Sequence, residues 1–248
     1  MKDIGLIETM RYDDGKVFLL DEHLRRLSSS CRRLGLRPPS ARVVRGAIGV
    51  LVRKSSLRRC RLRAVWSPQG GAMHLVLTSA ALLAVPASGY NVMLEQQRRL
   101  KVTPLCRHKT TRRTFYEALY AGARRRGFDE ALFFNADGAL VEGTRTNVFL
   151  VVSGRLLTPA LSCGCLPGVT RRAVLRLARR LKIPVRQTAL SFQDLCRCEE
   201  AFVTNSVVGI VPVRRLGLRH MPAPCPGPVT RRLLASYSKA VETKAVQV

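Results

Sequence analysis

The order of apolar and polar residues predicts a chain that alternates short strands with amphipathic helices. Apolar side chains recur at helical spacing over 22–34, and we expect Asp21 to cap this helix and Gly35 to end it. A second amphipathic helix is expected over 168–181, with arginines on its outer face. Other helices are expected over 41–54, 110–125 and 227–242. Strands are expected as two short segments within 5–20 and over 59–66, 73–79, 90–95, 130–134, 139–142, 146–152, 155–158, 184–188, 200–204 and 208–213.

Turn-forming residues mark where the expected strands pair and where the chain divides. Asp13-Asp14-Gly15-Lys16 and Asn135-Ala136-Asp137-Gly138 are both hairpin signals. The stretch 83–89 gathers small residues with proline and glycine, which indicates a linker. We therefore predict an α+β protein with a small domain over 1–82 and a larger, strand-rich domain over 90–248.

Net charge is the least ordinary property of the sequence. The 43 lysines and arginines exceed the 16 acidic residues and give +27 at pH 7, and they are spread along the chain. Such a field attracts polyanions, so a nucleic-acid-binding protein is one interpretation. Because no zinc-finger or RNA-recognition signature accompanies the charge, we favour solvated helix faces and a cationic entrance for a small anionic substrate. We expect no specific nucleic-acid partner.

Cysteine usage favours reduced thiols over disulfides or a metal site. No signal-peptide pattern opens the sequence, so we expect a cytoplasmic protein whose eight cysteines are free. The Cys-x-Cys pairs at 163/165 and 196/198 lack the usual zinc spacing, and we expect no metal. No apolar run approaches the roughly 20 residues that a spanning helix needs, so we expect no membrane partner.

Four short blocks in a fixed order carry the candidate chemistry. They offer a lysine in a basic run, a carboxylate at a strand end, a helix start whose N–H groups attract an anion, and a polar turn. Taken singly, each also fits an ordinary role: a surface lysine, a strand-ending glutamate, a plain helix start or a surface turn. The blocks are Arg107-His108-Lys109-Thr110-Thr111, Glu142-Gly143-Thr144-Arg145-Thr146-Asn147, Leu166-Pro167-Gly168-Val169-Thr170 and Thr204-Asn205-Ser206.

Together with the stretch from Leu6 to Leu27, these blocks resemble the fold-type IV pyridoxal phosphate enzymes, the class IV aminotransferase superfamily. The resemblance runs from about Gly5 to Val213 and is closest to 4-amino-4-deoxychorismate lyase, as in the lyase domain fused to aminodeoxychorismate synthase. It implies a small α/β sandwich and a larger pseudo-barrel domain, with pyridoxal 5'-phosphate bound between the two.

The resemblance gives a role to each matched residue. Lys109 would form the Schiff base with the cofactor, and Glu142 would hold the pyridine nitrogen protonated. Arg26 would pair with the phosphate, although a solvent-facing helix arginine is the plainer interpretation in so arginine-rich a chain. The other expected cofactor contacts are Asn147, Gly168, Val169, Thr170, Asn205 and Ser206.

Substrate contacts are less well marked than cofactor contacts. Thr9, Arg107 and Arg113 are the candidates. After the lysine, Arg112-Arg113-Thr114 stands where the aminotransferases usually carry an Asn-Tyr or Asn-Arg pair. A tyrosine for the phenolic oxygen of the cofactor is therefore not evident, and Tyr116 fits helix packing better.

The resemblance implies conversion of 4-amino-4-deoxychorismate to 4-aminobenzoate and pyruvate, a step of folate synthesis. A branched-chain or D-amino-acid-type aminotransferase is the alternative within the superfamily. A non-catalytic, basic nucleic-acid-binding protein is the alternative from another class. The resemblance further implies a homodimer, with an aminodeoxychorismate synthase as a candidate partner.

Overall fold

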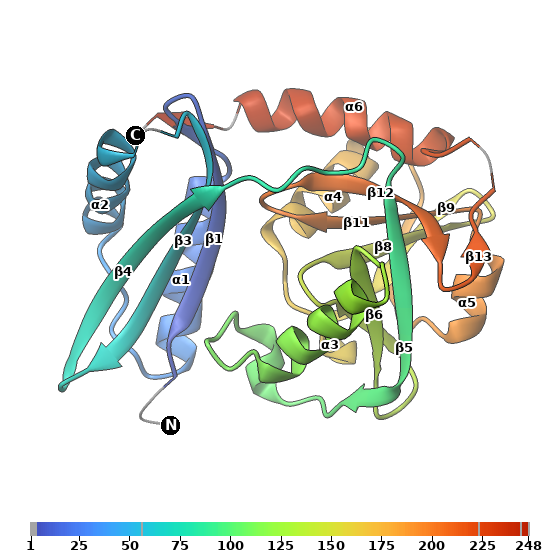
Figure 1. Cartoon of the computed structure of the whole chain (residues 1–248), viewed down its shortest axis with the longest axis horizontal. Helices are drawn as coiled ribbons and strands as arrows, with labels where there is room; N and C mark the ends of the chain where they lie inside the picture. The colour runs from blue at the N-terminus through green and yellow to red at the C-terminus, as the bar shows by residue number, and fades with distance from the viewer. Residues whose placement is uncertain (1–3, 56, 223, 244, 248) are drawn as a thin grey trace. The chain divides into compact units, whose positions relative to one another are not determined.

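The computed structural model describes residues 4–55, 57–222, 224–243 and 245–247 (Figure 1). The chain divides into two compact units. Unit 1 comprises Met1–Ala84, His108–Arg112 and Lys239–Val248, and unit 2 comprises Val85–Arg107 and Arg113–Ser238. Unit 1 is therefore discontinuous, and it takes in two segments that the expected 1–82 range leaves out.

Unit 1 is built on a five-stranded sheet in the order β14-β2-β1-β3-β4. Its neighbouring strands are antiparallel, and β1 pairs with β3 along its whole length. The hairpin from β3 to β4 turns at Gly70 and Gly71, where both residues have positive φ and glycine is favoured. The strands are β1 (Leu6–Asp13), β2 (Lys16–Val17), β3 (Arg59–Gln69), β4 (Ala72–Ala81) and β14 (Val246–Gln247).

Two helices complete the α/β sandwich of unit 1. Helix α1 (Leu20–Arg33) packs on β1, and α2 (Ala41–Lys54) packs on β4. The core of unit 1 lies between its helices and its sheet. Helices α1 and α2 and strands β1 and β3 all contribute fully buried side chains to it. Its largest members are Met10, Leu20, Ile48 and Leu62.

The expected Asp21 cap is wrong, because α1 begins one residue earlier than its capping signal. Its N-cap is Leu19, which lies in the left-handed region with φ 53° and makes no side-chain cap bond. Asp21 falls in the first turn, where it pairs with Arg45 of α2. The helix ends at Arg33, and Gly35 follows with φ +69°, as the sequence predicts.

Unit 2 contains a sheet whose strands follow the order β10-β9-β8-β11-β12-β5-β6-β7, with β13 paired to β12. The edge strand β7 also contacts β8 and β9, so the sheet curls back on itself. The strands are β5 (Tyr90–Leu100), β6 (Glu130–Asn135), β7 (Leu140–Gly143), β8 (Asn147–Val152), β9 (Arg155–Pro159), β10 (Val185–Thr188), β11 (Glu200–Asn205), β12 (Gly209–Leu216) and β13 (Arg219–His220).

Helices pack around this curled sheet, and aromatic side chains fill its core. Phe149 and Phe202 stack with their ring centroids 4.9 Å apart. The predicted α+β fold, with one small sandwich and one curled-sheet unit, is confirmed. The helices are η1 (Pro104–Arg107), α3 (Thr114–Arg125), η2 (Leu161–Cys163), α4 (Val169–Arg180), α5 (Phe192–Arg197) and α6 (Pro228–Thr243), the last of which ends within unit 1.

The expected helix over 110–125 is wrong in its first turn, since α3 begins at Thr114. Thr110 forms an antiparallel bridge with Leu6, and the N–H of Thr111 donates to the carbonyl of Gly5. Backbone groups that bond to a strand cannot also close a helical turn, so the helix starts after them.

Candidate functional site

Lys109 lies in a short extended segment fastened to β1. The N–H of Ile7 donates to the carbonyl of Lys109 (2.7 Å), and the N–H of Thr111 donates to the carbonyl of Gly5 (2.9 Å). Because β3 occupies the other edge of β1, this segment adds to the edge that β2 leaves open. The bonds fix the backbone from which the partly buried lysine side chain extends.

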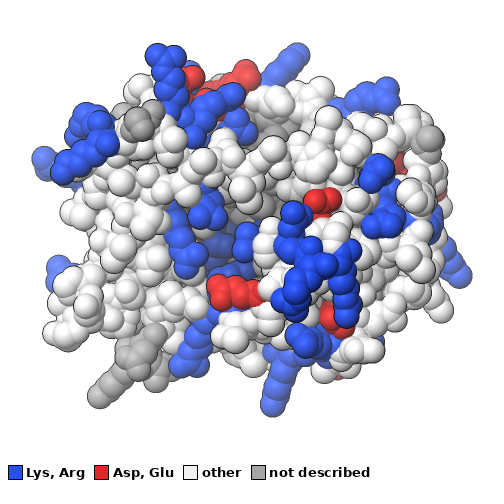
Figure 2. All heavy atoms as spheres, viewed as in Figure 1, with Lys and Arg blue, Asp and Glu red and all other residues white. Residues whose placement is uncertain are grey.

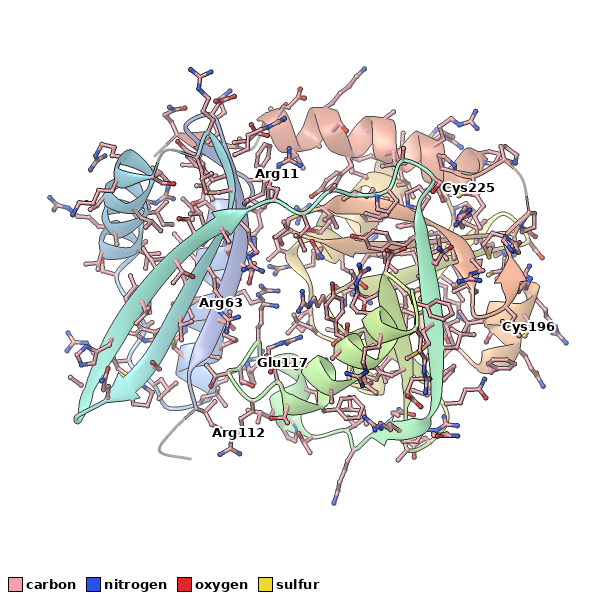
Figure 3. The ribbon with its side chains drawn as sticks, viewed as in Figure 1. Arg11, Arg63, Arg112, Glu117, Cys196 and Cys225 are labelled. Carbon is pink, nitrogen blue, oxygen red and sulfur yellow. The ribbon has the colours of Figure 1, made fainter. Side chains whose placement is uncertain are left out.

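Strand register places Lys109 and Thr9 on the same face of the sheet. Lys109 lies opposite Ile7, and side chains alternate between faces along a strand, so Ile7, Thr9 and Arg11 share the face of Lys109. Arg63 of β3 lies directly opposite Thr9, and Figure 3 labels it together with Arg11. Arg63 was not among the site residues predicted from the sequence, although arginine alternates with apolar residues along β3.

Arg26 is buried and held by the carboxylate of Glu8, which was not among the site residues predicted from the sequence. Its Nε lies 2.9 Å from Glu8 Oε1, and its Nη2 lies 2.5 Å from Glu8 Oε2. The ring Nδ1 of His23 lies 2.5 Å from the same Oε2 atom. Arg26 is therefore not the solvent-facing helix arginine of the plainer interpretation. Glu8 on β1 and His23 and Arg26 on α1 form a buried cluster within unit 1.

Burial and the neighbouring charges shift the pKa values of Glu8 and His23. Burial alone would raise the pKa of Glu8, but Arg26 and His23 lower it to about 2. Burial lowers the pKa of His23, against the attraction of Glu8 and with the charges of Arg26 and Lys109 acting in the same direction as burial. Glu8 is thus an anion at neutral pH, and the Glu8–Arg26 pair is ionised.

In unit 2, Glu142 and Asn147 form one hydrogen-bonded group. Glu142 is the last but one residue of β7 and is buried, and its Oε2 accepts from Asn147 Nδ2 (2.9 Å) and from the N–H of Leu166 (3.0 Å). Asn147 Nδ2 also donates to the carbonyl of Leu166 (3.0 Å). Two of the four sequence blocks are therefore in direct contact, and the carboxylate is fixed by two donors.

The start of α4 packs closely against this group. A Cβ atom at Gly168 would lie 1.9 Å from Asn147 Oδ1, so only glycine fits there. Gly168 is the N-cap of α4 and makes no side-chain cap bond, while Val169 and Thr170 in the first turn are buried. The first-turn N–H groups are thus available for an anion rather than satisfied by a capping side chain.

Two hydroxyls meet beside this helix start. Thr170 Oγ1 lies 3.5 Å from Ser206 Oγ. Asn205 shapes the turn that carries Ser206, because its Oδ1 accepts from the N–H groups of Val207 and Val208, both at 2.9 Å. Thr170 and Ser206, two of the residues predicted to bind the phosphate, therefore lie together. The side chain of Asn205 supports the turn that carries Ser206.

The two arginines proposed for substrate differ in their surroundings. Arg107 is exposed at the end of η1. Arg113 donates from Nη2 to the carbonyl of Thr144 (2.7 Å) and lies over the ring of Tyr116, 4.5 Å from its centroid. Burial raises the pKa of Tyr116, and its ring packs edge-on against Phe133, in keeping with the packing role predicted for it.

Two further properties concern the described part of the chain as a whole. Among its residues, no histidine, cysteine, aspartate or glutamate side chains form a group of three or more that could hold a metal ion. No helix among those residues combines the length and apolarity needed to cross a membrane.

Comparisons with known proteins place these residues in a family. The family model described as Amino-transferase class IV matches residues 5–216. The branched-chain-amino-acid aminotransferase of Escherichia coli is 37% identical over 116 residues, which cover 46% of this chain and 37% of that protein. The chain therefore spans well under half the length of that curated relative.

Solved structures match over nearly the whole chain. A Legionella pneumophila protein provisionally named 4-amino-4-deoxychorismate lyase is 25% identical with a TM-score of 0.85, covering 95% of this chain and 90% of that one. The branched-chain aminotransferase of Thermoproteus uzoniensis, solved with norvaline, is 28% identical with a TM-score of 0.86, covering 97% and 86%.

Proposed function

Because the chain belongs to the amino-transferase class IV family of fold-type IV pyridoxal phosphate enzymes, we propose that it is a lyase that converts 4-amino-4-deoxychorismate to 4-aminobenzoate and pyruvate. Its cofactor is pyridoxal 5'-phosphate, which supplies an electron sink for bond cleavage next to an amine-bearing carbon. The observation that carries the proposal is the Glu142 carboxylate, buried and fixed by Asn147 and Leu166 beside an uncapped helix start.

The residues of unit 2 fit this cofactor. A carboxylate held by two donors suits a protonated pyridine nitrogen, so Glu142 would bind there. The N–H groups of Val169 and Thr170 and the hydroxyls of Thr170 and Ser206 suit a phosphate. The side chain of Asn205 would act indirectly, by shaping the turn that carries Ser206.

The residues of unit 1 would bind the cofactor and transfer a proton. Lys109 is the proposed lysine of covalent attachment, and its amine would take a proton from the amine-bearing carbon of the substrate. Glu8 occupies the Nε and Nη2 side of Arg26, and a guanidinium carries five N–H donors, so Nη1 is the group that we propose for the phosphate. Thr9 of unit 1 and Arg107 and Arg113 of unit 2 remain proposed substrate contacts. Arg113 would use donors other than the Nη2 group that donates to the carbonyl of Thr144.

The assay that tests this function supplies 4-amino-4-deoxychorismate alone and follows 4-aminobenzoate by its fluorescence. A lyase gives many product molecules per protein molecule without a keto acid, because each catalytic cycle returns the cofactor to its starting form. Absence of product, from protein that shows the visible cofactor band, would overturn the lyase assignment and leave the family assignment in place.

A branched-chain aminotransferase is the second candidate, and the 37% identity to the Escherichia coli enzyme favours it. Such an enzyme would convert the bound cofactor to its amine form with a branched-chain amino acid alone, and a keto acid would restore the starting spectrum. Light scattering of the same samples would test the homodimer that we propose for either activity, and repeating it with an added aminodeoxychorismate synthase would test that partner.

A further inference from the structure

Glu130 is a buried carboxylate that the chemistry proposed above does not use. It opens β6 and is 2% exposed. The described part of the chain shows no lysine, arginine or histidine in an ion pair with it, so its hydrogen-bond donors are neutral groups. A buried anion without a cation is costly unless several donors surround it, so its partners indicate why it is there.

Five donors converge on the two carboxylate oxygens of Glu130. Oε1 accepts from the N–H of Ala131 (2.8 Å), the N–H of Thr144 (3.0 Å) and the hydroxyl of Thr144. Oε2 accepts from the N–H of Arg145 (3.0 Å) and the hydroxyl of Thr146 (2.9 Å). Four of the five donors belong to the turn 144–146, so the carboxylate forms the centre of that turn.

This turn connects most of the candidate site in unit 2. Glu142 and Asn147 flank it in sequence. Its carbonyls are also used, because Arg113 donates to Thr144 and Asn205 Nδ2 donates to Arg145 (3.3 Å). The turn therefore ties the carboxylate and amide of the proposed pyridine contact to the polar turn that carries Ser206.

Gly143 is closely packed against the turn and against Glu130. A Cβ atom at Gly143 would lie 2.2 Å from Thr146 Oγ1 and 3.0 Å from the Glu130 carboxyl group. Gly143 N–H also donates to the carbonyl of Thr146 (2.8 Å), which closes the turn on itself. A shift of the Glu130 carboxylate would therefore be transmitted to the backbone next to Glu142.

We propose that Glu130 is a positioning residue of the cofactor site, which holds the turn 144–146 so that Glu142 and Asn147 keep their orientation. This inference rests on the proposed function, since it assigns Glu142 and Asn147 to the cofactor. Glu130 touches neither cofactor nor substrate, and it acts through the backbone of the turn.

A carboxylate is required because its two oxygens accept from backbone N–H groups on both sides. In Glu130→Gln one oxygen is replaced by an NH2 group, which faces either the N–H of Ala131 or that of Arg145. Whichever way the amide turns, at least one backbone donor loses its acceptor on Glu130. An aspartate at the same place is one methylene shorter, so it would not reach all the donors.

The first measurement is amide hydrogen exchange in cofactor-free protein. In Glu130→Gln we expect exchange at Ala131 or Arg145 to be roughly tenfold faster or more, since a lost acceptor leaves the amide open to water. Unchanged exchange at both amides would overturn the proposal, because the turn would then not depend on the carboxylate.

The second measurement is pyridoxal phosphate affinity, read from the visible band that borohydride removes. Glu130→Gln should weaken binding by roughly 10- to 100-fold and shift the band, because the contact of Glu142 with the ring is misplaced. Thr146→Val, which removes one donor to Oε2, should weaken binding in the same direction, and Thr146→Ser should restore it. This pair keeps the test decisive if the Glu130 variant folds poorly.

Glu200 offers a matched control in the same unit. It is also buried, and its oxygens accept from the N–H groups of Val229 (2.9 Å) and Thr230 (2.8 Å) at the start of α6. Glu200→Gln should reduce thermal stability while leaving the cofactor band and affinity as in the wild type. An equal loss of affinity in both variants would overturn the proposal, since the effect would then be general destabilisation.

Failure of the proposed function would be distinguishable from failure of this inference. If the wild type shows no cofactor band, the proposed function fails, and the positioning role in that site fails with it. Faster exchange in Glu130→Gln with a wild-type band and affinity would leave the function standing and overturn the positioning role alone.

Discussion

At the scale of single residues, Lys109 makes the sharpest prediction. Lys109→Ala should lose the visible cofactor band that borohydride removes and should lose about 10²- to 10⁴-fold in product formation, because proton transfer by a positioned amine contributes that much. Lys101→Ala, which removes an exposed lysine from the same basic stretch, should keep both. Absorbance spectra and single-turnover assays check the pair, and a normal band in Lys109→Ala would exclude Lys109 as the attachment site.

The Glu8–Arg26 pair predicts a dependence of stability on pH. The folded-state pKa of Glu8 is lowered from 4.5 to about 2, so its stabilising contribution is complete above about pH 4.5 and is lost as the pH falls through about 2. His23 acts in the same direction, because its lowered pKa means that protonation below its ordinary value of 6.5 favours the unfolded chain. Urea unfolding between pH 7 and pH 2 should show this loss.

Glu8→Gln should remove the Glu8 component of that pH dependence. It should also destabilise the protein at pH 7 by about 3 to 5 kcal/mol, because Arg26 would stay buried without a counter-charge. Asp21→Asn, which breaks the more exposed pair with Arg45, should change stability by only about 0 to 1 kcal/mol. Equal effects of the two variants would show that burial does not decide the strength of these pairs.

At the scale of elements, the start of α4 predicts a steric effect. Gly168→Ala places a methyl group within 1.9 Å of Asn147 Oδ1, so Asn147 must leave Glu142 and Leu166. We expect cofactor affinity to fall by roughly tenfold or more, since two buried hydrogen bonds are broken together. Titration of the visible band measures this change.

Gly122→Ala is the control for that substitution. Gly122 lies within α3, and a Cβ atom there meets nothing within 4 Å. Alanine should stabilise the helix by about 0.5 to 1 kcal/mol and leave cofactor affinity unchanged. A loss of affinity in Gly122→Ala similar to that in Gly168→Ala would contradict a local steric cause.

Helices and strands with a strong local pattern were predictable from the sequence. The helix expected over 41–54 matches α2 to the residue, and the helix expected over 168–181 differs from α4 by one residue at each end. In both, apolar periodicity agrees with the packing of the fold. The stretch 110–113 was predicted as helix because local pattern cannot show that β1 takes its backbone hydrogen bonds.

One element was missed although its signal is present. Helix α5 begins after Ser191, whose hydroxyl accepts from the N–H of Asp194 (3.3 Å), while the Asp194 carboxylate accepts from the N–H of Ser191 (2.7 Å). This reciprocal cap belongs to a Ser-x-x-Asp pattern that can be recognised in a sequence. The helix is short, so apolar periodicity gives no help.

Motif residues were easier to find than the residues that hold them. Glu142 and Asn147 stand in one block, only five positions apart, so a contact between them could be expected from the sequence. Glu8 and Glu130 are ordinary strand glutamates in the sequence, because their partners lie 18 and 14 residues away in Arg26 and Thr144. Only the folded chain brings such distant groups together.

At the scale of the whole molecule, the net charge of +27 predicts non-specific binding to polyanions. Figure 2 shows lysine and arginine scattered over the visible face, with few acidic side chains among them. Duplex DNA should bind without sequence preference, and affinity should fall about 10³-fold between 50 and 200 mM salt if six or more phosphates are neutralised. Fluorescence anisotropy with two unrelated duplexes measures this. Binding that resists salt, or that prefers one duplex, would contradict a purely electrostatic origin.

The strand β14 has a consequence for the order in which the protein can fold during synthesis. Val246 pairs with Val17 and Gln247 with Lys16, so the edge of the first sheet is completed by residues that the ribosome adds more than 200 positions later. The segment that carries Lys109 likewise joins β1 only after about 100 further residues have been made. A nascent chain therefore carries an open sheet edge through most of its translation, and Lys109, the proposed attachment lysine, is synthesised before the residues that close that edge.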